Sequence, residues 1–306
     1  MKFLVMFRGT RDAFRRAEFE SLTRLVRGDE DGGSVPEFEE TPPLDKPAQV
    51  RLNGDVFRWV ELRSVEEAAE IAARSVLIRG IFVCWGHGAG YDECLRDALE
   101  RDPDMEPLRS GAELTFKCVV EAFGRSYSLD QQLERIHVFS PLLLKLAAKV
   151  RMRKPDYELW IMEDVFPSRG HRHVMPKTPE APRQVFLGFK VGTGGQHYVS
   201  TYTLKSRRYL GTTSMDAELA FLMANQGLVR RGSLVMDPFV GTGSITVSAA
   251  AFGALVIGSD IDITVLRGKD GADVASNFAQ YGLPPPLGTV RRTQAVSSRP
   301  AAAGEI

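Results

Sequence analysis

The sequence has few cysteines, no net charge and no apolar run typical of a membrane span. Its 306 residues include only three cysteines, Cys84, Cys94 and Cys118, and none of them form a Cys-x-x-Cys pair. This scarcity excludes a disulfide framework and a zinc ribbon, and it is typical of reduced, intracellular proteins. The 39 basic residues equal the 39 acidic ones, so net charge alone indicates neither a nucleic-acid nor a membrane partner.

The longest uncharged run, residues 238–259, is long enough to cross a bilayer but contains four glycines. Because turn residues and hydroxyl side chains interrupt it, we interpret it as buried strand and helix. The N-terminal apolar run closes at Arg8 and is too short for a signal peptide. We therefore expect no membrane partner and a cytoplasmic location. We also expect no metal site, because His171 and His173 have no third ligand nearby in the sequence.

The balanced charge is unevenly distributed. From Arg135 to Arg208, fourteen Lys and Arg stand against five Asp and Glu, a surplus of +9. Such a segment can follow the phosphates of a folded RNA, although charge runs are more often solvated faces. The candidate RNA-binding residues are Lys145, Lys149, Arg151, Arg153, Arg169, Arg207 and Arg208.

Strand-like and helix-like segments alternate along the first two hundred residues, which predicts mixed α and β structure. The pattern changes after Gly192, and we place a domain boundary near residue 205. Residues 206–286 then form a second domain. Residues 287–306 lack a hydrophobic period, and we expect a disordered tail there.

Residues 234–262 predict a βαβ unit. A short apolar strand runs into Asp237-Pro238-Phe239-Val240-Gly241-Thr242-Gly243, a helix of small residues follows, and a second strand ends at Asp260. A strand that enters a Gly-x-Gly turn lets backbone amides approach a ligand at the helix N-terminus. Alternatively, Gly241 and Gly243 serve only tight strand-helix packing.

Two acidic positions favour an adenosine ligand that carries an ammonium group. Asp260 lies 17 residues after Gly243, where a carboxylate can accept both ribose hydroxyl hydrogens. Asp237 in the turn favours an ammonium and disfavours a pyrophosphate, and Thr246 replaces the third glycine of a dinucleotide fingerprint. This pattern indicates S-adenosylmethionine and makes an NAD-dependent oxidoreductase the weaker alternative. The candidate cofactor residues are Asp237, Pro238, Gly241, Thr242, Gly243, Asp260 and Asp262, of which Asp262 could instead only cap the next helix.

Residues 207–282, with the run from RRYLGTTSMD to GSDID followed by LRGKDG, resemble the tRNA guanosine N2-methyltransferases of the eukaryotic and archaeal type that modify position ten. Residues 1–205 resemble the family's ferredoxin-like plus THUMP RNA-binding region, notably in IRGIFVCWGHG and FKCVVEAFGRSYSLDQQLERIHVFS. The resemblance implies an α/β fold, with an α+β N-terminal region followed by a partial Rossmann-like methyltransferase domain.

The resemblance also implies an activity and partners. The protein would transfer a methyl group from S-adenosylmethionine to the exocyclic amine of a guanosine in tRNA. A small zinc-binding methyltransferase activator protein supports the eukaryotic members. Thr213 and Asp216 would border the methionine end of the cofactor, or would serve only as a helix cap.

One expected element is missing from the sequence. Related enzymes hold the target amine with Asp/Asn-Pro-Pro-Tyr/Phe, whereas the run Pro284-Pro285-Pro286 lies between Leu283 and Leu287. We therefore assign no catalytic residue, and we expect a C-terminally truncated methyltransferase domain, incomplete in this chain. The alternative is a catalytically inactive tRNA-binding protein.

Overall fold

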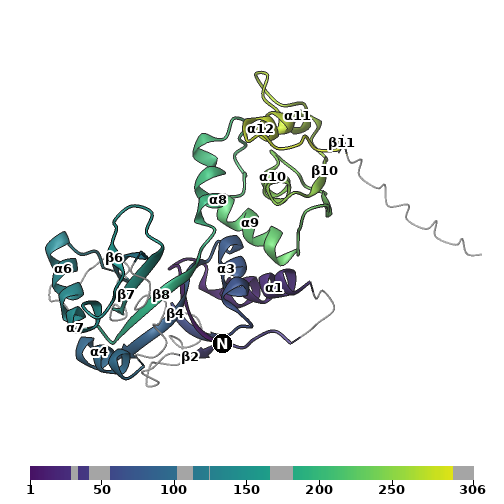
Figure 1. Cartoon of the computed structure of the whole chain (residues 1–306). Coiled ribbons are helices and arrows are strands. Elements are labelled where there is room, and N and C mark those ends of the chain that lie inside the picture. The colour runs from purple at the N-terminus through teal and green to yellow at the C-terminus, as the bar shows by residue number, and fades with distance from the viewer. Residues whose placement is uncertain (29–33, 41–55, 102–112, 124, 166–181, 292–306) are drawn as a thin grey trace, which may run out of the picture. The chain divides into compact units, whose positions relative to one another are not determined.

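The computed structural model describes residues 1–28, 34–40, 56–101, 113–123, 125–165 and 182–291, which form the mixed α/β architecture expected from the sequence (Figure 1). The chain divides into two compact units, Met1–Gly195 and Gln196–Ile306. The division falls ahead of the boundary expected near residue 205. Helix α8 (Gln196–Thr201) belongs to the second unit, because the ring of Tyr198 lies 5.1 Å from the rings of Phe221 and Phe252.

The first half of unit 1 has the ferredoxin-like order of elements. Its elements are β1 (Lys2–Phe7), the 3-10 helix η1 (Asp12–Phe14), α1 (Arg15–Arg27), β2 (Glu39–Glu40), β3 (Phe57–Glu61), α3 (Val65–Arg74) and β4 (Ile78–Gly88). The strands lie in the order β2-β3-β1-β4, and every neighbouring pair is antiparallel. This split βαβ arrangement is the one that the resemblance implied.

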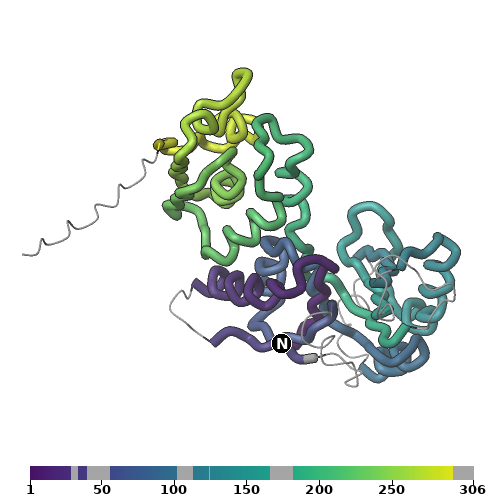
Figure 2. The backbone as a smooth tube through the Cα atoms, turned by 180° about the vertical axis from the view of Figure 1, so that it is seen from behind, coloured from purple at the N-terminus to yellow at the C-terminus, as the bar shows by residue number. Residues whose placement is uncertain are grey.

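The second half of unit 1 extends the same sheet to eight strands, in the order β2-β3-β1-β4-β8-β7-β5-β6. Its elements are α4 (Tyr91–Glu100), β5 (Thr115–Ala122), α6 (Leu129–Val138), α7 (Ser140–Leu143), β6 (Lys149–Val150), β7 (Tyr157–Asp164) and β8 (Gln184–Thr193). Figure 2 shows from behind how this half continues from the ferredoxin-like half. One buried cluster, which includes Leu4, Phe57, Phe82, Met162 and Phe186, spans both halves, so the halves share a core.

Unit 2 contains the expected βαβ segment, extended by further elements. These are α8, the 3-10 helix η3 (Leu204–Ser206), α9 (Ala217–Gln226), β9 (Leu234–Asp237), α10 (Ser244–Ala251), β10 (Leu255–Asp260), α11 (Ile263–Arg267), α12 (Val274–Gln280) and β11 (Gly288–Arg291). The three strands are parallel, in the order β11-β10-β9. None of the helices in the described ranges is long and apolar enough to cross a membrane.

Strand β11 corrects the prediction that residues 287–306 form a disordered tail. Val290 pairs with Ser259, and the backbone N–H of Leu287 donates to the carbonyl oxygen of Val256 at 2.8 Å. The strand spans only Gly288–Arg291, which is too short to show a period in the sequence. Residues 292–306 lie outside the described ranges.

Candidate cofactor site

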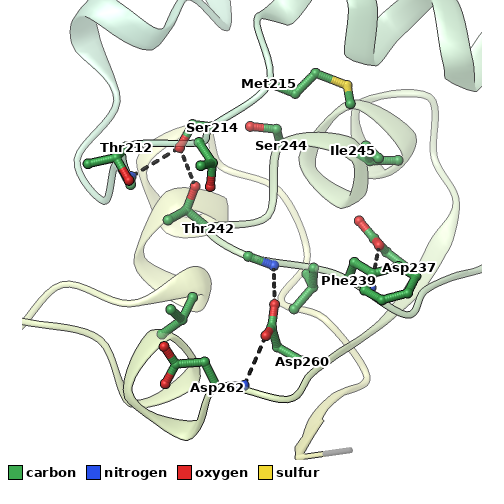
Figure 3. A pocket seen from close by; sticks show the side chains of 15 residues that line it. Thr212, Ser214, Met215, Asp237, Phe239, Thr242, Ser244, Ile245, Asp260 and Asp262 are labelled. Atoms are coloured by element: carbon green, nitrogen blue, oxygen red, sulfur yellow. Dashed lines mark hydrogen bonds between the residues drawn. The ribbon is translucent and has the colours of Figure 1, made fainter.

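A pocket of about 460 Å³ opens where β9 and β10 end (Figure 3). The carboxyl ends of parallel strands are the usual ligand-binding edge of an open α/β sheet, and the volume lies in the range of small-molecule sites. The pocket is lined by Gly211, Thr212, Thr213, Ser214, Met215, Asp237, Phe239, Val240, Gly241, Thr242, Ser244, Ile245, Asp260, Asp262 and Val265. It therefore brings together most of the cofactor residues proposed from the sequence, and Pro238 and Gly243 lie in the same turn.

Asp237 is the last residue of β9 and is only 7% exposed. Its Oδ1 accepts the backbone N–H of Phe239 at 2.9 Å. Burial raises the pKa of the Asp237 carboxyl above its ordinary value, the hydrogen bond from Phe239 lowers it, and the nearby charge of Asp260 raises it further. An ammonium group bound beside Asp237 would offset the unfavourable contributions.

The glycine turn approaches the pocket with its backbone. Gly241 has φ +51° and donates its N–H to Oδ2 of Asp260 at 2.9 Å. Gly243 has φ +88°, and a Cβ there would lie 3.0 Å from Cγ1 of Val274 in α12. Close packing of the turn against α12 therefore favours a glycine at Gly243. At Gly241 a Cβ would meet nothing closer than 3.9 Å, so helix packing does not demand a glycine there.

Asp260, the last residue of β10, and Asp262, in the turn after it, have different roles in the fold. Asp260 accepts the N–H of Gly241 on Oδ2 and the N–H of Asp262 on Oδ1, at 2.9 and 3.0 Å, and so joins the strand end to the turn. Oδ1 of Asp262 caps α11 by accepting the N–H and Oγ1–H of Thr264, at 2.8 and 2.6 Å. The hydrogen bond from the Thr264 side chain lowers the pKa of the Asp262 carboxyl. Asp262 is therefore a cap that also lines the pocket.

Residues Gly211–Met215 line the side of the pocket away from Asp260 and Asp262 in Figure 3. Oγ of Ser214 accepts the N–H of Gly211 at 3.0 Å and lies 2.7 Å from Oγ1 of Thr242. Thr213 lines the pocket, whereas Asp216 caps α9 through Leu219 and is not among the lining residues. Sequence reasoning missed Ser214 and Ser244, because single hydroxyl residues carry no motif signal.

The described basic residues proposed for RNA binding are divided between the two units. Four of them have exposed side chains in or near β6, an edge strand of the unit 1 sheet, and we call this group the basic edge: Lys145, Lys149, Arg151 and Arg153. Arg208 is exposed in unit 2. The prediction that Arg207 binds RNA is corrected by its burial, since the residue is only 6% exposed. Its guanidinium donates to Oγ of Ser244 at 2.6 Å and to the carbonyl oxygen of Tyr202, so it stabilises the interior of unit 2. Arg169, His171 and His173 lie outside the described residues, and the residues within the described ranges contain no metal-ligating cluster.

The fold and site define the class of unit 2. A parallel sheet with a glycine turn after β9, and carboxylates at the ends of β9 and β10, is a Rossmann-like architecture. A family model described as the Tmrp11 THUMP N-terminal domain matches residues 52–196. Over most of its length the chain is similar to curated tRNA (guanine(10)-N(2))-methyltransferases.

Two curated relatives carry that name. The TRMT11 protein of Dictyostelium discoideum is 32% identical over 290 residues, which cover 92% of this chain and 55% of the relative. The protein of Saccharomyces cerevisiae is 33% identical over 275 residues, covering 88% and 57%. The chain thus spans somewhat more than half the length of these relatives. The solved structure of TrmN from Thermus thermophilus aligns with a TM-score of 0.44 at 17% identity, covering 96% of this chain and 74% of that one.

Proposed function

We propose that unit 2 binds S-adenosylmethionine in the pocket at the ends of β9 and β10. The proposal rests on a buried carboxylate, Asp237, that lies beside the glycine turn and accepts the N–H of Phe239. Asp260 at the end of β10 holds the same turn by accepting the N–H of Gly241. Asp237 would face the ammonium of the methionine group. Asp260 has lone pairs left for ribose hydroxyls after accepting two backbone N–H groups. The ring of Phe239, 70% exposed at the pocket, offers an apolar contact.

The charges around the pocket support a cationic ligand over a dinucleotide. Among the described residues that line it, three are aspartates and none is Lys, Arg or His. A pyrophosphate would meet repulsion there, whereas a sulfonium and an ammonium would be stabilised. The charges of the pocket therefore favour S-adenosylmethionine over NAD.

The proposed reaction is methylation of the exocyclic N2 amine of a guanosine in tRNA, as the names of the relatives state for those proteins. The amine nitrogen would attack the methyl carbon, the carbon-sulfur bond would break, and S-adenosylhomocysteine and one proton would leave. Unit 1 would bind the tRNA through its basic edge. A cytoplasmic location and a small zinc-binding activator protein also remain proposals from the family.

The test is methyl transfer by the purified full chain. We expect radioactive methyl groups from S-adenosylmethionine to appear on a guanosine N2 of unmodified tRNA, and Asp237→Ala to abolish this transfer. The sequence contains no Asp/Asn-Pro-Pro-Tyr/Phe motif to hold the amine, so the assay is run with and without the activator protein. Salt-sensitive tRNA binding without transfer in either condition would reject the enzymatic proposal for this chain and favour a tRNA-binding protein.

A further inference from the structure

The pocket wall Gly211–Met215 is held by a residue that lies outside the pocket. Asn277 of α12 is fully buried. Its Nδ2 donates to the carbonyl oxygens of Tyr209 at 2.8 Å and Thr242 at 2.9 Å, and its Oδ1 accepts the N–H of Tyr209 at 2.8 Å. One side chain therefore ties the segment that enters the wall to the glycine turn across from it.

We propose that Asn277 is a positioning residue, which sets the distance between the wall Gly211–Met215 and the glycine turn and thereby shapes the part of the pocket that takes the methionine group of the cofactor. The inference rests on the proposed binding of S-adenosylmethionine. Asn277 is absent from the pocket lining, so it acts through Tyr209 and Thr242.

The chemistry of the contact explains why the residue is an asparagine. The two backbone carbonyls need two donor hydrogens, and the N–H of Tyr209 needs an acceptor. A primary amide supplies both hydrogens and the oxygen from one planar group. A carboxylate would keep only the acceptor and would face two carbonyl oxygens, and an alanine would leave all three backbone groups without this partner.

A second contact fixes the same segment. The hydroxyl of Tyr209 donates to the carbonyl oxygen of Val265, at 2.9 Å, and Val265 also lines the pocket. The wall then continues to Ser214, whose Oγ lies 2.7 Å from Oγ1 of Thr242. Asp260 and Asp262, proposed for the adenosine, belong to β10 and the turn after it and do not contact Asn277 through any of these bonds. Loss of Asn277 should therefore weaken contacts to the methionine group more than contacts to the adenosine.

Gln280 provides a matched control on the same helix. Its Oε1 accepts the N–H of Arg208 at 2.7 Å, and its Nε2 donates to the carbonyl of Ser206 at 2.6 Å. It binds the same segment through the same amide chemistry but has no bond to the glycine turn. Gln280→Glu repeats the amide-to-carboxylate change of Asn277→Asp without touching the pocket.

The experiment compares two ligands by calorimetry on the full chain. S-adenosylhomocysteine contains the amino acid group, and methylthioadenosine lacks it. We expect Asn277→Asp and Asn277→Ala to weaken S-adenosylhomocysteine binding about ten- to a hundredfold, to change methylthioadenosine binding less than about threefold, and Gln280→Glu to change neither by more than that. A merely structural role would weaken both ligands alike.

A milder variant keeps the test decisive if Asn277 substitutions do not fold. Tyr209→Phe preserves the ring and removes only the bond to Val265, and it should shift the two affinities in the same unequal way by a smaller factor. Equal losses for both ligands, or no loss in folded variants, would overturn the positioning role. If the unsubstituted protein bound neither ligand, the proposed cofactor itself would be wrong, which is a separate result.

Discussion

Asp237 has opposite effects on the stability of unit 2 and on its proposed ligand. Burial raises the pKa of its carboxyl above the ordinary 3.8, and the charge of Asp260 adds to this increase. The folded protein therefore holds this proton more tightly than the unfolded chain does. Stability falls as pH rises from 3.8 through the raised pKa, and the full penalty remains at neutral pH.

The substitution Asp237→Asn should accordingly stabilise the ligand-free protein at pH 7 by up to about 1 kcal/mol. An asparagine can keep the hydrogen bond from the N–H of Phe239 while removing the buried charge. The same change should weaken S-adenosylmethionine binding at least about tenfold, because the ammonium loses its counter-charge. Thermal unfolding with and without ligand measures both effects. A variant that lost stability and kept affinity would contradict the role of Asp237.

The sequence pattern points to the acidic residues that line the pocket but not to the polar residues around them. Asp237 and Asp260 stand at strand ends beside a glycine turn, so the local pattern places them in the site. Asn277 is a single polar residue in the helix VASNFAQ, and its partners Tyr209 and Thr242 lie 68 and 35 residues away in the chain. Only the tertiary structure brings these groups together. Arg207 was misassigned for a related reason, because a sequence shows charge but not burial.

Stability and cofactor affinity should both depend on Gly243 in the glycine turn between β9 and α10. Gly243→Ala places a methyl group 3.0 Å from Val274 at φ +88°, so we expect a loss of about 2–4 kcal/mol in unfolding free energy and a collapse of cofactor affinity. Gly232→Ala is the control, since Gly232 has φ +83° and open space around it. That variant should lose only about 1–2 kcal/mol and keep its affinity. Urea unfolding and calorimetry of both variants measure the contrast, and equal affinity losses would contradict it.

Three charged residues on neighbouring strands of unit 1, Lys117, Glu158 and Lys190, form a network of ion pairs that we call the charge ladder. Glu158 in β7 pairs with Lys117 of β5 at 2.7 Å and with Lys190 of β8, and accepts Nε1–H of Trp160 at 3.0 Å. Burial alone would raise the pKa of Glu158, but these bonds hold it at about 2, below its ordinary 4.5. The ladder therefore stabilises unit 1 above pH 4.5, and this contribution is lost as pH falls towards 2.

Glu158→Gln should reduce that pH dependence. We expect the variant to lose about 1–2 kcal/mol at pH 7, after allowance for the partial exposure of the pair, and to show a flatter decline below pH 4.5. Tryptophan fluorescence reports on this unit, because Trp59, Trp85 and Trp160 all lie in it. Glu20→Gln, which breaks the exposed pair of Glu20 with Arg16, should leave the acid profile unchanged. An unchanged profile in Glu158→Gln would show that the ladder does not control acid stability.

Element type was easier to predict than element boundaries. The βαβ unit of 234–260 was predicted because its strands, turn and helix each follow a local rule. Strand β11 was missed because four residues, GTVR, gain their structure from pairing with β10. Helix α9 begins at Ala217 with Asp216 as its cap, since the backbone of the aspartate is extended and its side chain accepts the N–H of Leu219.

The whole molecule combines a basic edge in unit 1 with an acidic pocket in unit 2. If the basic edge binds RNA phosphates, replacing Lys145, Lys149, Arg151 and Arg153 together by Gln should weaken tRNA binding and lower the slope of log affinity against log salt by roughly three. Replacing the exposed Arg230 and Arg231 should change the slope little. Filter binding over a range of salt concentrations measures this. If the variant with all four substitutions kept the slope of the unsubstituted protein, these four residues would not form the RNA-binding surface.

A calorimetric titration of the full chain with S-adenosylmethionine tests whether the pocket of unit 2 takes this cofactor. We expect saturable binding of one S-adenosylmethionine per chain, weaker binding in Asp237→Asn, and no binding of NAD. Binding of NAD without binding of S-adenosylmethionine would instead assign unit 2 to the dinucleotide-binding proteins.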